Sequence, residues 1–289
     1  MNRKAIITGT IILTTANLIT RCMGFFNRVY LSNAIGAEGI GLYQLILPVY
    51  GLAWSITSAG FTTAISHLTA QEHAKRQKGN ITKIVRQSVF LSLCISLWIA
   101  LLLFFGSETV ARFILKDSRV TYPLQLLAFA IPFMAIGSCL RGFFIGLQES
   151  SIPAISQVLE QTVRILTVYF LAGFFVPMGL TYACIAATVG IFCGEFLSCC
   201  FIIWNYSHYK KKHLFTQNPT ISSCFALKSV LTMAIPLSAA RISSSLLSTV
   251  ENIMIPQQLQ KYGQNTAQAL TSYGELTGMA MPLLMLPSA

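Results

Sequence analysis

The chain has 289 residues, of which 54% are hydrophobic and only 10% are charged. Soluble globular domains carry about 25% charged residues, so this chain has too few charges to cover a water-exposed surface. Together with a mean hydropathy of +0.64, this predicts an all-α, polytopic bundle of transmembrane helices. The net charge of +11 does not indicate nucleic acid as a partner, because the basic residues form short clusters between apolar runs.

The sequence carries no pattern typical of an enzyme or a metal site. It lacks G-x-S-x-G, a phosphate loop and metal-ligand spacings, and its acidic residues are scattered singly. No C-x-x-C or Cys/His spacing occurs, so we interpret the cysteines as reduced thiols packed among helices. We therefore expect no catalytic residues, no cofactor and no metal.

A spanning helix needs about 20 mainly apolar residues, and the chain offers a series of such runs. The basic start and first apolar run are similar to a signal peptide, but the run continues past Arg21 without a small-residue cleavage site, so we expect a retained helix. In chain order the predicted spans are Ala5–Asn33, Ile40–Ser66, Ile84–Phe105, Tyr122–Phe144, Ile152–Phe175, Leu180–Trp204, Ala226–Ile255 and the incomplete Leu270–Ala289.

A long polar segment divides these spans into two groups. We expect residues 1–206 to form a six-helix lobe, residues 207–225 a basic cytoplasmic linker, and residues 226–289 the first two helices of a truncated second lobe. The chain stops inside an apolar run without a polar flank, which is typical of a fragment of a longer protein.

The basic residues of the loops predict the orientation in the cytoplasmic membrane. Only Arg112, Lys116, Arg119 and Lys261 fall in one set of alternate loops. The positive-inside rule therefore places the richer set, and with it the N-terminus, in the cytoplasm. The richer set comprises Arg3, Lys4, Lys75, Arg76, Lys78, Lys83, Arg86, Arg141, Lys210, Lys211, Lys212 and Lys228.

Two arginines lie inside the first predicted span. An arginine at a helix centre costs about 2.5–3.5 kcal/mol on insertion scales, so its presence needs an explanation. Asn17, Arg21 and Arg28, together with Thr14 and Gly24, are spaced by three or four residues and form one polar stripe. Such a stripe is typical of a helix that faces a water-filled cavity or the bundle interior. Snorkelling to the membrane surface is the alternative, above all for Arg28.

The first predicted helix after the linker carries a similar polar stripe with an arginine. Arg241 shares one side of this helix with Ser244, Ser245, Ser248 and Asn252, and Glu251 adjoins that side. Arg241 occupies the first helix of the second lobe as Arg21 occupies that of the first, which is a faint internal repeat of the kind that transporters show.

Two acidic residues lie inside the fifth and sixth predicted spans. Glu160 and Arg164 are four residues apart, in the order that favours an ion pair, and either a packing role or a functional one fits them. Glu195 has no partner on its own helix. It is a candidate proton or cation site, or else the counter-charge of an arginine on another helix.

The runs "TRCMGFFNRVYLSNAIGAEGIGLYQLILPVYGLAWSITSAGFTTAIS", "IPLSAARISSSLLSTVENIMIPQQLQ" and "SYGELTGMAMPLLMLPSA" resemble the stage V sporulation protein B family. This family belongs to the polysaccharide exporters, in the superfamily of multidrug exporters, oligosaccharidyl-lipid flippases and lipid II flippases. The resemblance implies two six-helix lobes around a central cavity. It also implies an activity that moves undecaprenyl-diphosphate-linked oligosaccharide or peptidoglycan precursor across the membrane.

Arg21 and Arg28 match by position the cavity arginines of the first helix in lipid II flippases. Those flippases usually carry an acidic residue after the second arginine, where this chain has Val29, and Glu275 occupies the region of a further arginine on their eighth helix.

The arginines would then hold a diphosphate, because guanidinium groups pair with phosphate oxygens in a fork. We expect substrate contacts from Arg21, Arg28, Arg241 and Asn17. Candidate sites for a coupling cation, H⁺ or Na⁺, are Glu195, Glu160 and Glu275. The competing interpretations are a cation-coupled multidrug antiporter of the same superfamily and a non-transporting membrane scaffold in sporulation.

Overall fold

The computed structural model describes residues 3–213, 219–281 and 284. In this part of the chain the regular structure is helical and no strand occurs, which confirms the all-α prediction. The α-helices are α1 (Arg3–Trp54), α2 (Gly60–Ala74), α3 (Lys78–Thr109), α4 (Thr121–Gly146), α5 (Ser151–Phe175), α6 (Leu180–His213), α7 (Ser223–Lys261) and α8 (Thr266–Tyr273). Short π-helical and 3-10 segments extend or join them: η1 (Ser55–Ala59), η2 (Val110–Leu115), η3 (Ser118–Val120), η4 (Val176–Met178) and η5 (Gly274–Ala280).

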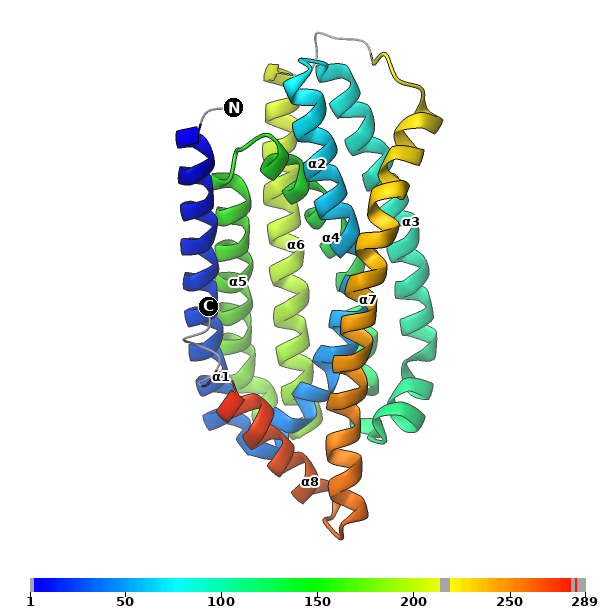
Figure 1. Cartoon of the computed structure of the whole chain (residues 1–289). Coiled ribbons are helices and arrows are strands. Elements are labelled where there is room, and N and C mark those ends of the chain that lie inside the picture. The colour runs from blue at the N-terminus through cyan, green and yellow to red at the C-terminus, as the bar shows by residue number, and fades with distance from the viewer. Residues whose placement is uncertain (1–2, 214–218, 282–283, 285–289) are drawn as a thin grey trace.

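Helix α1 contains a reversal of chain direction. Gly36 has φ 70° and ψ 179°, a backbone conformation that is open to glycine and strained for other residues. The apolar segment Ile7–Ala74 is 68 residues long, about 100 Å if it were one straight helix and therefore far longer than a bilayer is thick. The first part of α1 runs along one side of the molecule, and the part after Gly36 returns towards α2 (Figure 1).

Among the described residues, six helical segments are long and apolar enough to cross a membrane. The first of them, Ile7–Ala74, accounts for the first two predicted spans, which are joined without a polar loop. The final predicted span, Leu270–Ala289, is represented by α8 and η5, and part of it lies outside the described residues.

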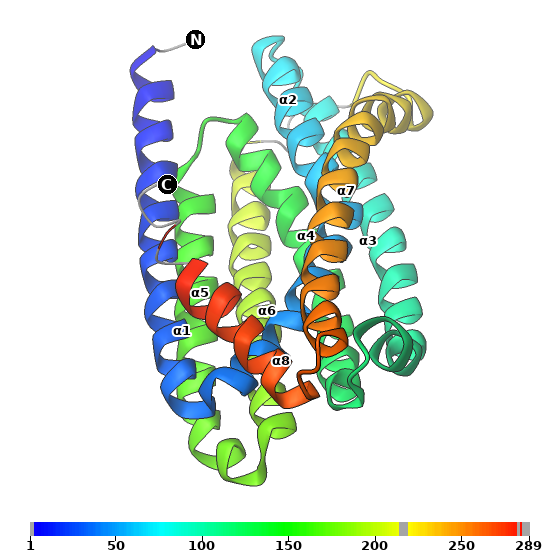
Figure 2. The same ribbon diagram turned by 60° about the horizontal axis from the view of Figure 1, so that its bottom comes forward.

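Several helix ends differ from the sequence prediction. Helix α6 continues to His213 and α7 begins at Ser223, so the predicted linker 207–225 starts inside a helix. Arg141 was predicted near the end of the fourth span and counted with the loop that follows. It lies inside α4, as the predicted span has it, but its side chain contacts α5 and α6 and does not belong to the loop. The remaining basic clusters still lie at the end of the bundle that holds the α2–α3 turn and the α6–α7 connection (Figure 2).

The distribution of polar and apolar side chains on α3 indicates that the bundle is surrounded by lipid. Its serines Ser88, Ser92 and Ser96 are fully buried, whereas Phe90 and Trp98 are 65% and 66% exposed. The Ser92 hydroxyl donates to the Thr57 carbonyl at 2.8 Å, within the π-helical segment η1. This polarity is the inverse of a soluble protein, and it fits a helix whose outer side chains contact lipid.

Small residues let the helices approach closely. A Cβ on Gly194 of α6 would lie 2.7 Å from the Glu160 carbonyl oxygen of α5, and one on Gly190 would lie 3.0 Å from the Arg164 carbonyl oxygen. Both glycines therefore hold α6 against α5 along the segment that carries the charged residues.

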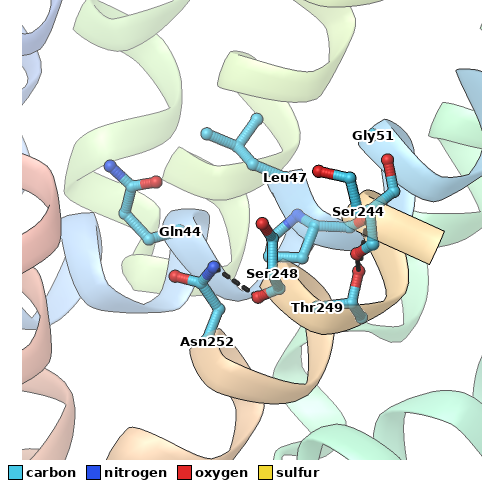
Figure 3. A pocket seen from close by; sticks show the side chains of 9 residues that line it. Gln44, Leu47, Gly51, Ser244, Ser248, Thr249 and Asn252 are labelled. Atoms are coloured by element: carbon cyan, nitrogen blue, oxygen red, sulfur yellow. Dashed lines mark hydrogen bonds between the residues drawn. The ribbon is translucent and has the colours of Figure 1, made fainter. Parts of the chain in front are cut away.

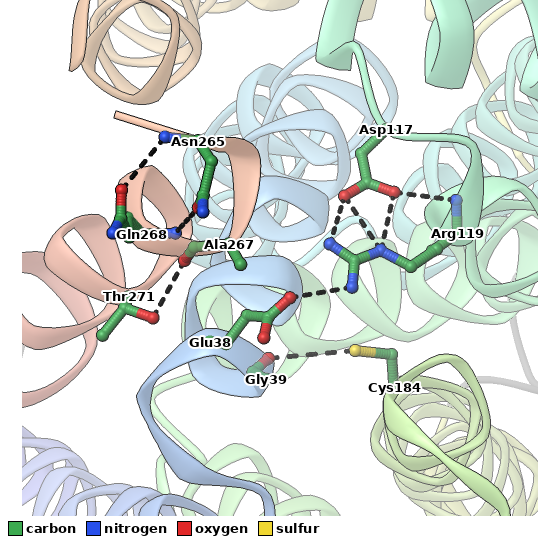
Figure 4. A network of polar contacts seen from close by, with 9 residues as sticks. All are labelled: Glu38, Gly39, Asp117, Arg119, Cys184, Asn265, Ala267, Gln268 and Thr271. Atoms are coloured by element: carbon green, nitrogen blue, oxygen red, sulfur yellow. Dashed lines mark hydrogen bonds and ion pairs between the residues drawn. The ribbon is translucent and has the colours of Figure 1, made fainter. Parts of the chain in front are cut away.

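The opposite end of the bundle is held by an ion-pair cluster. Arg119 pairs with Asp117 at 2.7 Å and with Glu38 at 2.9 Å, and Glu38 lies two residues after the reversal at Gly36 (Figure 4). The Cys184 thiol donates to the Gly39 carbonyl at 3.9 Å. These contacts fix the turn of α1 to the α3–α4 connection and to α6.

We expect Gly194→Val to destabilise the protein, because the added carbons meet the backbone of α5. Overpacking of this kind typically costs about 1–3 kcal/mol. Gly173→Val is the matched control on α5, since a Cβ there meets nothing within 4 Å. Thermal unfolding of the two variants in detergent measures the difference. Equal midpoints would show that the α5–α6 approach does not limit stability.

Candidate functional site

The predicted polar stripe of α1 lies beside α5. A Cβ on Gly24 would lie 3.5 Å from the Gln161 side-chain nitrogen, and the rings of Tyr30 and Tyr169 are 5.4 Å apart. Asn17 and Arg21 are exposed. Among the described residues Arg21 forms neither a hydrogen bond nor an ion pair, so its charge is not neutralised within this part of the chain.

Arg28 lies two stripe positions after Arg21 and is partly buried. Arg28 and Arg164 lie close enough to the Tyr43 hydroxyl to interact with it electrostatically. Tyr43 belongs to the part of α1 that follows Gly36, so Arg28 faces the returning half of its own helix.

Arg241 lies on α7 and is exposed. Like Arg21, it has no hydrogen-bond or ion-pair partner in the part of the chain that the structure describes. Helix α7 packs so closely against α2 that a Cβ on Gly60 would overlap Ser238 and the Ala234 carbonyl. The first part of α1 and α7 stand on opposite sides of the molecule in both views (Figures 1 and 2). The structure therefore does not bring Arg21 and Arg241 into contact, and a shared ligand remains a prediction.

A network of charged side chains joins α4, α5 and α6. Glu160 of α5 pairs with Arg164 of the same helix at 2.8 Å, which confirms the predicted pair, and with Arg141 of α4 at 3.5 Å. Arg141 also donates to the Ser198 hydroxyl of α6 at 3.4 Å. These contacts join the three helices. The two arginines neutralise the charge of Glu160.

Glu195 of α6 accepts a hydrogen bond from the Tyr50 hydroxyl at 2.5 Å. Its exposed fraction is 5%, and the described residues offer it no ion pair within 4.0 Å. Glu160, Arg141 and Arg164 lie near enough to act on it electrostatically. The sequence pattern did not reveal Tyr50 as its partner, because the two residues are separated by 145 positions. Glu275, the third candidate acidic residue, is exposed in η5 and belongs to neither cluster.

A polar pocket of about 280 Å³ lies between the returning part of α1 and α7 (Figure 3). Its apolar lining is Leu47, Pro48 and Gly51. Its polar lining comes from uncharged side chains only: Gln44, Ser244, Ser245, Ser248, Thr249 and Asn252. The serine-rich side of α7 was predicted to face a cavity, but the contribution of Gln44 could not be read from the sequence.

Chemically, the structure separates two kinds of polar group. On α4, α5 and α6, Arg141, Glu160 and Arg164 are ion-paired and Glu195 is hydrogen-bonded, as buried charges must be. On the two polar stripes, Arg21 and Arg241 present guanidinium groups without an acidic partner among the described residues. Unpaired guanidinium groups within apolar spans suit an anionic ligand and disfavour a cation.

The family model described as "Polysaccharide biosynthesis protein" matches residues 6–289. The chain belongs to the polysaccharide biosynthesis protein family. Stage V sporulation protein B of Bacillus subtilis (strain 168) is 35% identical over 292 residues, covering 100% of this chain and 56% of that protein. Lipid II flippase MurJ of the same organism is 29% identical over 214 residues, covering 68% of this chain and 39% of that protein. The chain thus spans about half the length of the first of these relatives.

Solved structures share the fold of this family member. A MOP superfamily transporter from Pyrococcus furiosus, described as having a binding pocket of reverse polarity, superposes with a TM-score of 0.68 at 16% identity, covering 97% of this chain and 68% of its own. The MATE multidrug transporter DinF-BH, solved as a complex, gives 0.71 at 13% identity, covering 99% and 62%. At these identities the likeness establishes the helix arrangement alone.

We expect Glu160→Gln to destabilise the protein by about 3–5 kcal/mol, because it leaves Arg141 and Arg164 without their shared counter-charge. The double variant Glu160→Gln/Arg164→Met removes one charge of each sign and should cost clearly less. Thermal unfolding in detergent compares the two. If the double variant is the less stable one, the network does not depend on charge balance.

Proposed function

We propose that this protein is part of a membrane flippase that moves a polyprenyl-diphosphate-linked sugar across the cytoplasmic membrane by alternating access. The diphosphate and the sugar are polar and must cross hydrocarbon, while the polyprenyl chain can remain in lipid. A cationic, hydrated path between two lobes lowers that barrier. Membership in the polysaccharide biosynthesis protein family and similarity to Stage V sporulation protein B support this assignment.

The observation that carries the proposal is a pair of arginines that have no acidic partner among the described residues. Arg21 and Arg241 lie on polar stripes of helices that are otherwise apolar enough to span a membrane. A diphosphate offers each of them oxygens in the geometry that a guanidinium fork matches. Arg28 would bind further along the same side of α1, and Asn17 would donate an amide hydrogen.

A coupling cation is part of the proposal, with Glu195 as the most suitable residue. Glu160 is already paired with two arginines, and Glu275 is exposed outside both clusters. Glu195 is buried, and its direct partner is a neutral hydroxyl. A carboxyl in this position can take up or release a proton without breaking an ion pair.

A multidrug antiporter is the second candidate, favoured by the fold of the solved neighbours. A cationic drug would need acidic side chains in its binding path, and the stripes of α1 and α7 carry arginine instead. A non-transporting scaffold would need no arginine on those stripes. Flipping of a fluorescent polyprenyl-diphosphate sugar in proteoliposomes of the full-length protein separates all three functions.

Arg21→Ala in the full-length protein should abolish flipping without lowering membrane expression. Arg21→Lys should retain part of the rate, because a point charge keeps attraction and loses the bidentate geometry. Arg241→Ala should behave like Arg21→Ala, and the double variant should be little worse than either single one if both side chains serve one phosphate group.

Arg112→Ala is the matched control for loss of a positive charge, because Arg112 pairs with Glu108 at 2.7 Å and is 63% exposed. It should flip at the normal rate. A normal rate in Arg21→Ala would show instead that this arginine is a snorkelling residue, and the diphosphate assignment would fail.

The proposed orientation has its own test. In a cysteine-free background, Lys211→Cys should be shielded from an impermeant thiol reagent in intact cells, whereas Lys261→Cys at the α7–α8 turn should react. The background must be cysteine-free because Cys94, Cys200 and Cys224 are exposed. The reverse labelling pattern would place the N-terminus outside the cytoplasm.

A further inference from the structure

The pocket between α1 and α7 has the wrong chemistry for a phosphate. None of its lining side chains carries a charge, so it cannot offset the negative charge of a diphosphate. It is also poorly suited to lipid, because six of its lining side chains carry hydroxyl or amide groups. Groups of this kind donate and accept hydrogen bonds, as the hydroxyl groups of a sugar do.

Hydrogen-bonding capacity in the pocket is left over after the protein's own contacts. The Ser244 and Ser248 hydroxyls have no hydrogen-bond partner among the described residues, and both side chains are exposed to the pocket. Gln44 is buried, with an exposed fraction of 7%. Its nitrogen donates to the Thr277 carbonyl at 3.4 Å, whereas no described residue donates to its side-chain oxygen. The main-chain carbonyl of Gln44 lacks its usual helical donor as well, because the residue four positions later is Pro48, which has no N–H.

Other side chains of the pocket are already oriented. The Asn252 amide nitrogen donates to the Ser248 carbonyl at 2.7 Å, and its oxygen accepts from the Tyr273 hydroxyl at 2.9 Å. The Thr249 hydroxyl lies between the Ser245 carbonyl at 2.7 Å and the Pro48 carbonyl at 3.3 Å. Because these contacts join α7 to α1 and to α8, the pocket walls are fixed before any ligand enters, as small-molecule sites usually are.

We propose that this pocket binds the first sugar of the lipid-linked substrate, the one attached directly to the diphosphate. Ser244 and Ser248 are three and seven residues after Arg241 on one side of α7, about 4.5 and 10 Å along the helix axis. This order, cation and then hydroxyl groups, matches the order of diphosphate and sugar in the substrate. The volume of about 280 Å³ fits one sugar ring, since pockets for drug-sized ligands begin at about 300 Å³. Leu47 supplies an apolar wall for the C–H groups of the ring.

This inference rests on the proposed function, and a binding experiment separates the two. The full-length protein in detergent is titrated with undecaprenyl diphosphate and with undecaprenyl-diphosphate N-acetylglucosamine. We expect the sugar-bearing lipid to bind on the order of tenfold more tightly, as two or three net hydrogen bonds would give. Ser248→Ala combined with Gln44→Leu should reduce that preference to near onefold while leaving the affinity for undecaprenyl diphosphate unchanged.

Ser243→Ala is the matched control, because the Ser243 hydroxyl is bound to the Ala239 carbonyl at 3.0 Å and does not line the pocket. It should keep the full preference. Arg241→Ala should weaken both lipids equally. Equal binding of the two lipids by the unaltered protein, or an equal loss of both in Ser248→Ala/Gln44→Leu, would overturn the sugar site and leave the diphosphate assignment standing. Failure of the unaltered protein to bind undecaprenyl diphosphate would overturn the proposed function itself.

Discussion

A polar group inside a bilayer must find its partner within the protein, because hydrocarbon offers none. The rest of this structure follows from that constraint. The serines of α3 point inwards to backbone carbonyls while phenylalanine and tryptophan point outwards. Glu160 is held between two arginines, and Glu195 is held by Tyr50. Arg21 and Arg241 are exposed on apolar helices, and the described chain gives neither of them an ion-pair partner. These two unpaired charges are what points to a ligand.

The glycines of the helix contacts serve the same constraint. Gly190 and Gly194 bring α6 close enough to α5 for Arg141 of a third helix to reach Glu160. Larger side chains would separate these helices and leave the charges without partners. Stability and the geometry of the Glu160 network are therefore coupled, whereas Arg21 and Arg241 on the polar stripes of α1 and α7 are exposed.

Fold class and most spanning segments could be predicted from hydropathy alone, since length and apolarity decide which segments cross a bilayer. The Glu160–Arg164 pair was predictable because it is local. Arg141 was misplaced because its sequence position near a helix end gives no information on which way the side chain points. Tyr50 and Gln44 could not be found, because their partners are Glu195 and Thr277, far away in the chain and brought close only by the reversal at Gly36.

The central claim is that Arg21 and Arg241 bind one diphosphate between them. An experimental structure of the full-length protein with undecaprenyl diphosphate tests it most directly. The account predicts phosphate oxygens about 2.7–2.9 Å from both guanidinium groups, the distance of a charge-assisted hydrogen bond. A diphosphate bound instead among the lysines at the α2–α3 end, with Arg21 turned towards lipid headgroups, would contradict it.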